Sequence, residues 1–482
     1  MNNLQDYILY NIERPLIFNS GLFLFLFLGF LGGFILLKKQ GIGRILWTIV
    51  FSLFFYYKSS GFYFWILILS TVVDYVLGIY MFKAKKTRRT IYLLISLLSN
   101  LGILIYFKYT NFFINILNDL GANYEISDIF LPVGISFYTF QTLSYSIDIY
   151  RGKLTPERNI LNFAFFVTFF PQLVAGPIVR ASEFLPQLRS KLKLSNQNLS
   201  QAVFLIGSGL FKKAIISDYI SVNYVDRIFD NPLLYSGVEN LIAVYAYALQ
   251  IYCDFSGYSD IAIGLALLLG FYLPINFDSP YKSSSITEFW RRWHISLSSW
   301  LKDYLYISLG GNRKGLFRTY INLLITMLLG GLWHGANWKF VFWGAMHGVM
   351  LVIEKIINTA FHIPKHIIIR ILGIILTFHF VSFCWIFFRA DSFSTGINIL
   401  YQIRNDFNIN LFEQVTEAYP YVILMIVIGY ILHVLPKKFE LNFVKFIEAC
   451  PLVIKAFFLS FICWIIVQVS GADVVPFIYF QF

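Results

Sequence analysis

Two histidines in tryptophan-rich segments are the side chains of this chain best suited to proton transfer. His294 ends the segment Phe289–His294, which reads Phe-Trp-Arg-Arg-Trp-His, and His334 lies in Leu332–Trp338, which reads Leu-Trp-His-Gly-Ala-Asn-Trp. Histidine has an ordinary pKa near neutrality, so it can accept a proton and return it. Ionisable groups at membrane depth are costly and usually face a cavity lined by protein. The two residues therefore indicate proton chemistry inside a helical bundle.

A glycine break strengthens this reading for His334. A single histidine beside tryptophans is more often a hydrogen-bonded structural residue than a catalytic one. The apolar stretch Ile321–Ile356 is too long for one membrane span, however, and it contains Gly330, Gly331 and Gly335. We expect a helix that is broken at these glycines, with the freed backbone groups facing a polar lining. A catalytic base is expected at such a break.

The other histidines are weaker candidates. On a continuous helix, His347 would lie about 20 Å further along than His334 and on a different face, so we expect it to pack elsewhere. His362 and His366 have the i, i+4 spacing of metal ligands, but Pro364 lies between them, which favours a solvated loop. We therefore expect no metal site and no bound cofactor.

The composition is that of a membrane protein. Of the 482 residues, 58% are hydrophobic and 13% are charged, and the mean hydropathy is +0.66. Soluble domains carry roughly twice that charged fraction. We predict an all-α polytopic protein with a single integral membrane domain over residues 1–482. It should contain about eleven transmembrane helices, some re-entrant or interfacial.

The positive charge lies mainly in short loops. The formal net charge is +12, and two basic clusters are separated by two apolar stretches, 45–57 and 62–82. Both clusters should therefore lie on one side, which the positive-inside rule makes cytoplasmic, with the N-terminus outside. Dispersed charges form no continuous basic face, which argues against nucleic acid as a partner. The clusters are Lys38, Lys39 and Arg44, and Lys83, Lys85, Lys86, Arg88 and Arg89.

Two segments read differently from the spans. Residues 283–305 alternate apolar and polar positions at helical spacing, which predicts one amphipathic helix at the interface or in the mouth of the bundle. Its Arg291, Arg292 and Lys302 would attract donor phosphates or, equally, fix the helix at lipid headgroups. The second segment, residues 392–420, is predicted to be a polar loop with a short helix before the last spans.

Three carboxylates interrupt apolar surroundings. Asp74, Asp254 and Asp260 must each be paired, hydrogen-bonded or protonated. Structural polar contacts between helices are the favoured reading, and a role in a pathway or site is the alternative. The four cysteines lack CxxC spacing and read as small core residues. No serine-hydrolase elbow, zinc-protease motif, nucleotide loop or dinucleotide fingerprint is present.

At these residues the chain resembles a known family. It is similar to the membrane-bound O-acyltransferase (MBOAT) superfamily, in its bacterial branch of alginate O-acetylase-like proteins. The resemblance covers roughly residues 15–390, and we see no departure at the two histidine motifs. The matching segments are Ser70–Gly78, Pro132–Gln141, Phe170–Pro177, Tyr252–Asp260, Phe289–His294, Leu332–Gly335, Trp343–Gly348 and Phe388–Ala390.

The resemblance implies a function and an MBOAT-type bundle with funnels that open towards both faces. It implies that His334 matches the catalytic histidine and His294 a second active-site position. Family members move an acyl group, usually acetyl in this branch, from a cytoplasmic thioester such as acetyl-CoA towards a hydroxyl of an extracytoplasmic polysaccharide. They commonly work with an extracytoplasmic SGNH-type acyltransferase partner in the bacterial cell membrane. Further substrate-binding residues are expected to be Trp293, Trp333, Asn337, Arg291 and Arg292.

A mechanism follows as a hypothesis. Neutral His334 would accept the proton of an acceptor hydroxyl as that hydroxyl attacks the thioester, and His294 would hydrogen-bond the substrate or the developing oxyanion. Transfer would be direct or through a partner side chain. A transporter or polysaccharide export protein is the alternative, although it would be expected to show inverted repeats, which we do not see. A scaffold that anchors a partner enzyme is a third reading. The sequence does not name the acceptor.

Overall fold

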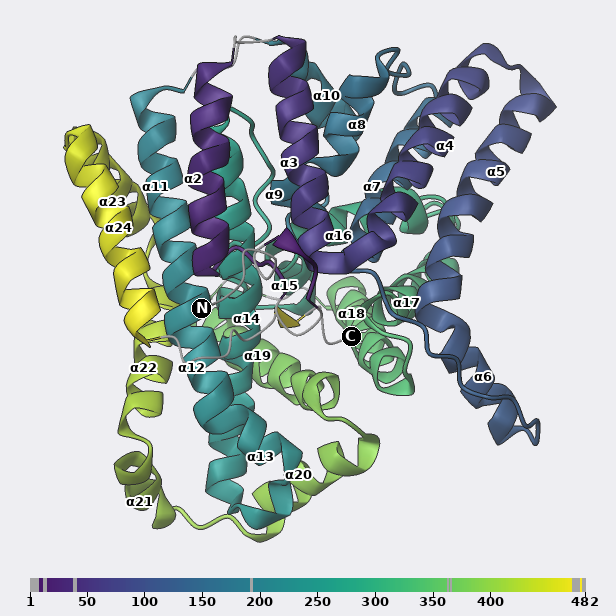
Figure 1. The fold of residues 1–482 in the computed structure, drawn as a ribbon. Coiled ribbons are helices and arrows are strands. Elements are labelled where there is room, and N and C mark those ends of the chain that lie inside the picture. Colours follow the sequence, from purple (N-terminus) through teal and green to yellow (C-terminus); the bar gives the residue numbers. More distant parts are fainter. Residues whose placement is uncertain are drawn as a thin grey trace. The chain divides into compact units, whose positions relative to one another are not determined.

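The computed structural model is helical throughout the residues that it describes. These are residues 8–11, 15–37, 41–190, 194–361, 364, 366–469 and 477–478, and they contain no strand. The chain divides into two compact units, chiefly Met1–Ile206 with Ser259–Pro274, and Gly207–Tyr258 with Ile275–Gly471. Figure 1 shows the ribbon of both units. The all-α polytopic class predicted from the sequence is confirmed.

Seven helical segments within the described residues are long and apolar enough to cross a membrane. The number becomes eight if α21 (Leu411–Ala418) and α22 (Pro420–Val434), which are bent by 94°, form one span. Two shorter apolar helices lie at Gly21–Leu36 and Leu452–Ile466. These figures are lower than the expected eleven or so. Ile42–Lys83 counts as one segment although it contains α3 (Ile42–Ser60) and α4 (Phe64–Lys83), and other apolar stretches form helices too short to cross alone.

The first unit consists of helices joined by short connections. Its α4, α5 and α7 lie side by side (Figure 1). The elements are α2 (Gly21–Leu36), α3 (Ile42–Ser60), η1 (Gly61–Tyr63), α4 (Phe64–Lys83), α5 (Lys86–Leu104), η2 (Ile105–Tyr109), α6 (Thr110–Asp119), α7 (Ile135–Tyr150), α8 (Ile160–Thr168), α9 (Phe170–Leu173) and α10 (Ala181–Arg189).

A buried polar cluster joins α4, α5 and α7. Asp74 is fully buried, and its carboxylate accepts hydrogen bonds from the Ser96 hydroxyl at 2.6 Å and from the Asn100 amide at 2.8 Å. The Ser146 hydroxyl lies 3.2 Å from the same carboxylate. Each helix thus contributes at least one polar group to the cluster. Inside a membrane, apolar side chains pack equally well against lipid and protein, so hydrogen bonds of this kind help to hold helices together.

The basic clusters can be placed in part. Arg44 lies near the start of α3 and donates to the Leu37 carbonyl at 2.9 Å. The second cluster occupies the end of α4 and the start of α5, where Arg89 donates to the Ile149 carbonyl at 2.6 Å. In Figure 1 α3 begins at the same end of the unit at which α4 finishes, as the charge pattern predicts. Lys38 and Lys39 lie outside the described residues, as does His362.

The second unit carries both histidine motifs. Helices α11 (Asn196–Leu210) and α14 (Gly237–Leu268) contain residues of both units. The other elements are η3 (Phe211–Ser217), α12 (Asp218–Ile220), η4 (Ser221–Val225), α13 (Asp226–Asp230), η5 (Pro232–Leu234), η6 (Pro280–Lys282), α15 (Ile286–Arg292), α16 (Ile295–Trp300), η7 (Leu301–Tyr306), α17 (Leu316–His334), α18 (Trp338–Ala360), α19 (Ile367–Arg389), α20 (Phe393–Asn405), α21, α22, α23 (Lys437–Ala449) and α24 (Leu452–Val469).

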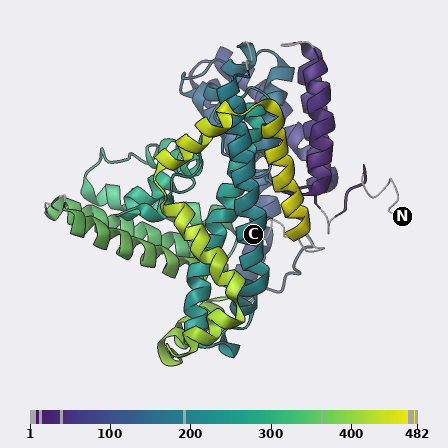
Figure 2. The ribbon, with the colours of Figure 1, turned by 90° about the vertical axis from the view of Figure 1, so that its left-hand side faces the viewer.

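Helices α17 and α18 form a tight antiparallel hairpin, seen in green as a pair in Figure 2. Glycine makes their approach possible. A Cβ on Gly331 would lie 2.2 Å from the Phe340 carbonyl oxygen, and one on Gly344 would lie 2.3 Å from that of Met327. Small residues at helix contacts let backbones approach closely in membranes. The glycine pair therefore sets the distance between the two helices.

The segment 392–420 differs from the loop expected there. It contains two helices, α20 and α21, separated by a short connection. Ser392 starts α20, because its side chain accepts a hydrogen bond from the Thr395 backbone at 3.1 Å. Such a cap satisfies a backbone N–H that the first turn leaves unpaired. The polar composition of the segment concealed this helix start.

The Asp74 cluster yields a stability prediction. In Asp74→Leu, the Ser96 and Asn100 groups lose their acceptor inside the helix pack, so the protein should lose roughly 1–3 kcal/mol of stability. Asp74→Asn keeps one acceptor oxygen and should lose less. Thermal unfolding of the detergent-solubilised protein measures both. The matched changes at exposed Asp119 on α6 should have little effect, and equal losses at the two positions would contradict the role given to the cluster.

Candidate active site

His334 is the last residue of α17. The helix ends there because Gly335 adopts an extended conformation, with φ −165° and ψ 150°. Helix α18 restarts after Asn337, whose side chain accepts a hydrogen bond from the Lys339 backbone at 3.0 Å. The predicted break is therefore present, but it lies at Gly335 and not at Gly330 and Gly331. That pair remains helical.

Aromatic rings surround His334. Its ring centroid lies 5.1 Å from that of Trp333, 5.0 Å from that of Trp343 and 5.4 Å from that of Phe388. All three rings stand nearly perpendicular to the imidazole, at 80°, 83° and 74°. Only 3% of the residue is exposed. The three rings form an aromatic cage that leaves little of the imidazole open to solvent.

His294 lies at a strained turn between α15 and α16. Its φ of 42° is in the left-handed region, which residues other than glycine adopt at an energetic cost. Asn276 fixes the chain where it leaves this turn: its carbonyl accepts from the Ile295 backbone N–H at 2.9 Å, and its side chain accepts from the Ser296 hydroxyl at 2.9 Å. Strain of this kind is retained where the surroundings impose it, often at functional sites.

This turn corrects one expectation. Residues 283–305 do not form one amphipathic helix, because the left-handed residue at 294 ends the helical path and redirects the chain into α16. His294 is fully buried and lies outside the candidate spans. Burial lowers its pKa to about 3, so the ring is neutral at neutral pH. A neutral imidazole has one N–H to donate and one nitrogen to accept with.

One indole lies between the two histidines. The Trp333 ring centroid is 5.8 Å from that of His294 and 5.1 Å from that of His334. His294 also contacts Phe255 of α14, with the two ring centroids 4.6 Å apart. Two histidines far apart in the sequence thus meet around a shared aromatic neighbour. The hairpin supplies one of them and the α15–α16 turn supplies the other.

His347 is closer to this cluster than the sequence predicted. Its ring lies 4.7 Å from that of Trp343, which also contacts His334, and it stacks on Phe289 of α15 at 6.1 Å. The expectation that it would pack elsewhere assumed a continuous helix from 334 to 347. Because α17 ends at His334 and α18 folds back, that assumption is wrong.

The expected substrate-binding residues have different surroundings. Trp293 is 1% exposed and packs against Phe277, Phe289 and Trp385 at 5.1, 5.6 and 5.0 Å. Asn337 caps α18, as described above. Trp293 therefore contributes to the packed interior, and Asn337 contributes to the start of a helix.

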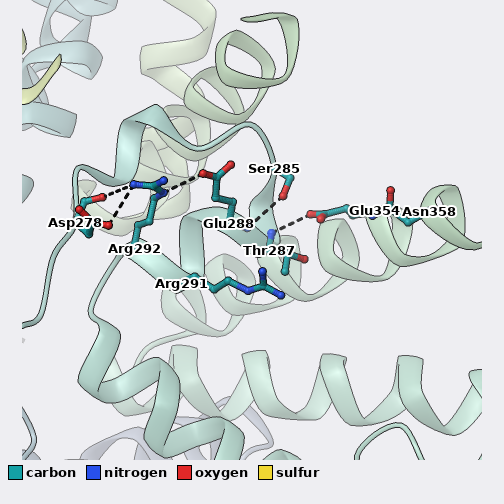
Figure 3. Close-up of a pocket in the computed structure, with 8 residues that line it drawn as sticks. All are labelled: Asp278, Ser285, Thr287, Glu288, Arg291, Arg292, Glu354 and Asn358. Carbon is teal, nitrogen blue, oxygen red and sulfur yellow. Dashed lines mark hydrogen bonds and ion pairs between the residues drawn. The ribbon is translucent and has the colours of Figure 1, made fainter. Parts of the chain in front are cut away.

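The arginines diverge. Arg292 pairs with Glu288 at 3.0 Å and with Asp278 at 3.4 Å, whereas Arg291 is exposed and makes no ion pair within the described residues. Both line a pocket between α15 and α18, shown in Figure 3. Binding of substrate stays a prediction for all five expected residues, which are Trp293, Trp333, Asn337, Arg291 and Arg292.

Sequence reasoning missed several residues of the site. Phe255 and Phe388 lie in motifs that the family resemblance covers, but nothing in their spacing marks them as ring contacts of a histidine. Nothing in the sequence marks Asn276 as a residue of the site, because it acts by hydrogen-bonding the backbone and side chain of the turn after His294. Within the described residues, no three or more His, Cys, Asp or Glu side chains lie where they could hold a metal ion.

Comparisons with known proteins agree on one family. The model of the membrane-bound O-acyltransferase family (MBOAT) matches residues 53–393. A peptidoglycan O-acetyltransferase of Helicobacter pylori is 38% identical over 80% of this chain and 79% of its own length. A probable alginate O-acetylase AlgI of Pseudomonas aeruginosa is 40% identical over 78% of this chain and 72% of its own. A teichoic acid D-alanyltransferase of Streptococcus thermophilus is 31% identical over 54% of this chain and 68% of its own length.

The Glu288 contacts predict a pH-dependent stability. Burial alone would raise the pKa of this carboxyl, but hydrogen bonds from Ser284 and the charge of Arg292 bring it below its ordinary 4.5. Ionised Glu288 therefore stabilises the fold above about pH 4.5, and this contribution disappears as the pH falls through the lower pKa of the folded state.

Glu288→Gln tests this linkage. The variant should be less stable than the parent protein by roughly 1 kcal/mol near neutral pH, and the difference should shrink in acid. Thermal unfolding at several pH values measures it. A difference that is the same at every pH would show that the substitution acts through packing and not through charge.

Proposed function

Because this chain belongs to the membrane-bound O-acyltransferase family and is a multi-pass O-acyltransferase, we propose that it acylates a hydroxyl of an extracytoplasmic polysaccharide. The acyl group is acetyl, and its donor is a cytoplasmic thioester such as acetyl-CoA. The cell membrane of a bacterium is the proposed location. The family match favours this function over the transporter and scaffold alternatives.

The names of the relatives support the polysaccharide acceptor. Two of them are named for O-acetylation of peptidoglycan and of alginate, and they cover most of this chain. These two glycans differ in backbone and charge, so the shared feature is a sugar hydroxyl outside the cytoplasm. The proposal therefore names the acceptor by that group and leaves the polymer open.

The observation that carries the mechanism is the meeting of His294 and His334 around Trp333. In the proposed step, the imidazole of His334 accepts the proton of the acceptor hydroxyl as the oxygen attacks the thioester carbonyl. The C–S bond then breaks, and the departing thiolate takes the proton from the imidazolium. The proton is thus returned, and the histidine is ready for another cycle.

His294 has a complementary part in this proposal. Its neutral ring donates an N–H to the oxygen of the thioester carbonyl as negative charge develops there. Donors that are already oriented stabilise such an oxyanion without having to reorganise during the reaction. The hydrogen bonds of Asn276 would supply this orientation, because they hold the two residues that directly follow His294.

The route after the first transfer is part of the proposal. Either the sugar hydroxyl itself or a side-chain hydroxyl of an SGNH-type extracytoplasmic partner attacks the thioester. In the second case the partner passes the acyl group on to the glycan. Trapping an acylated partner protein supports the relay, and glycan acylation by the purified chain alone supports direct transfer.

Loss of the His334 imidazole should remove most of the activity. His334→Gln keeps a hydrogen-bonding side chain but no base, so acetyl transfer should fall by roughly 10²–10⁴-fold. The measurement is the O-acetyl content of purified surface glycans from cells that carry the variant, the parent gene or no gene. The amount of folded protein in the membrane is measured in the same cells.

A matched histidine provides the control. His379 lies on α19, is exposed and belongs to no part of the site, so His379→Gln should keep the parent O-acetyl content. If the His334 variant folded and still acetylated the glycans at the parent rate, its assignment as the base would be wrong. If no glycan fraction depended on the gene, the acetyl-transfer proposal itself would fail.

His294 allows its backbone and side-chain roles to be separated. Asparagine tolerates the left-handed conformation better than most residues, so His294→Asn should fold at least as well as His294→Gln. If the imidazole takes part in the reaction, both variants should lose acetyl transfer by roughly 10²-fold or more. Activity that follows the stability of the two variants would instead assign His294 a structural role only.

A further inference from the structure

The pocket between α15 and α18 has two groups of lining residues. Its volume is about 630 Å³, and none of the active-site histidines lines it. Figure 3 shows the side chains. The α15 side supplies Ser285, Thr287, Glu288, Arg291 and Arg292, the α18 side supplies Glu354 and Asn358, and Asp278 completes the lining.

The charges of the pocket are only partly paired. Arg292 is held by Glu288 and Asp278, as described above. Arg291 and Glu354 carry opposite charges and point towards the same region beside Thr287 (Figure 3), yet they form no ion pair with each other. One oxygen of Glu354 accepts from the Thr287 backbone at 2.9 Å. The pocket therefore presents one cation and one anion that face a common space.

The balance of charge restricts the ligand. Three carboxylates (Asp278, Glu288 and Glu354) and two guanidinium groups line the pocket, so it carries one net negative charge. Such a lining disfavours a polyanion, including the phosphates of coenzyme A. A ligand that carries both a phosphate and an amine complements it, because the phosphate pairs with Arg291 and the amine with Glu354.

The surroundings indicate a lipid. Glu354 and Asn358 lie in the last two turns of α18, a candidate span, so the pocket lies near the end of that span. Apolar side chains next to these residues are exposed: Ile353 by 42%, Ile356 by 45% and Ile357 by 40%. A headgroup in the pocket would thus have an apolar surface beside it for acyl chains.

We propose that this pocket binds the headgroup of a zwitterionic phospholipid with a primary amine, of the phosphatidylethanolamine class. Arg291 binds the phosphate, Glu354 and Asn358 bind the ammonium group, and the exposed isoleucines of α18 contact the chains. The bound lipid holds α15 against α18 and so stabilises the element that leads into His294. This proposal does not depend on the acyl-transfer chemistry.

Binding of defined lipids to the full-length chain in detergent tests the proposal. Native mass spectrometry and thermal shift compare short-chain phosphatidylethanolamine with phosphatidylcholine, phosphatidylglycerol, glycerophosphoethanolamine and acetyl-CoA. The ethanolamine lipid should bind at least about tenfold more tightly than the choline and glycerol lipids. Equal binding of all three lipids would overturn the specificity. Equal binding of the chain-free headgroup would overturn the lipid source. Competition by acetyl-CoA would assign the pocket to the donor instead.

Two substitutions separate the charges. Glu354→Gln should abolish the preference for phosphatidylethanolamine over phosphatidylglycerol. Arg291→Gln should lower the affinity for every phospholipid by about tenfold. Lys355→Gln is the matched control, since Lys355 is adjacent on α18 but does not line the pocket; it should bind as the parent does. A parent-like lipid preference in folded Glu354→Gln would exclude the proposed site.

Discussion

The close approach of α17 and α18 is the constraint on which the site depends. At Gly331 and Gly344 the backbone of each helix takes up the space that a side chain would need, so only glycine permits this distance. The hairpin then brings Trp343 against His334, although the two are nine positions apart in the sequence and a helix break lies between them. Packing by small residues thus creates the aromatic cage, since the larger rings fill the remainder of the interface.

The second histidine depends on a different device. His294 has no helix to hold it, because it occupies the turn at which α15 ends and α16 begins. Asn276 holds that turn with its carbonyl and its side chain, and the strained backbone persists because these bonds impose it. A rigid helix end and a pinned turn therefore meet at Trp333. The two parts of the site can tolerate different substitutions, since one depends on helix packing and the other on a few hydrogen bonds.

Much of the class could be predicted from the sequence, and less of the geometry. Apolar length and charge placement indicated a polytopic helical protein, and the glycines indicated a break beside His334. The break lies at Gly335, one of the three glycines named, whereas Gly330 and Gly331 stay helical, because glycine also serves close packing, as Gly331 does. The left-handed residue at 294 was missed for another reason: helical periodicity continues through it. The expected position of His347 is wrong because the distance between His334 and His347 was taken along one continuous helix, whereas the chain folds back between them.

The enclosure of His334 has a consequence for fidelity. A thioester activated for attack by a sugar is equally open to attack by water, which is smaller and far more abundant. With only 3% of His334 exposed and rings on three sides, few water molecules can reach its imidazole. Opening of the cage only around a bulky acceptor would protect the donor from wasteful hydrolysis. Trp333 and Trp343 would then limit the loss of donor to hydrolysis.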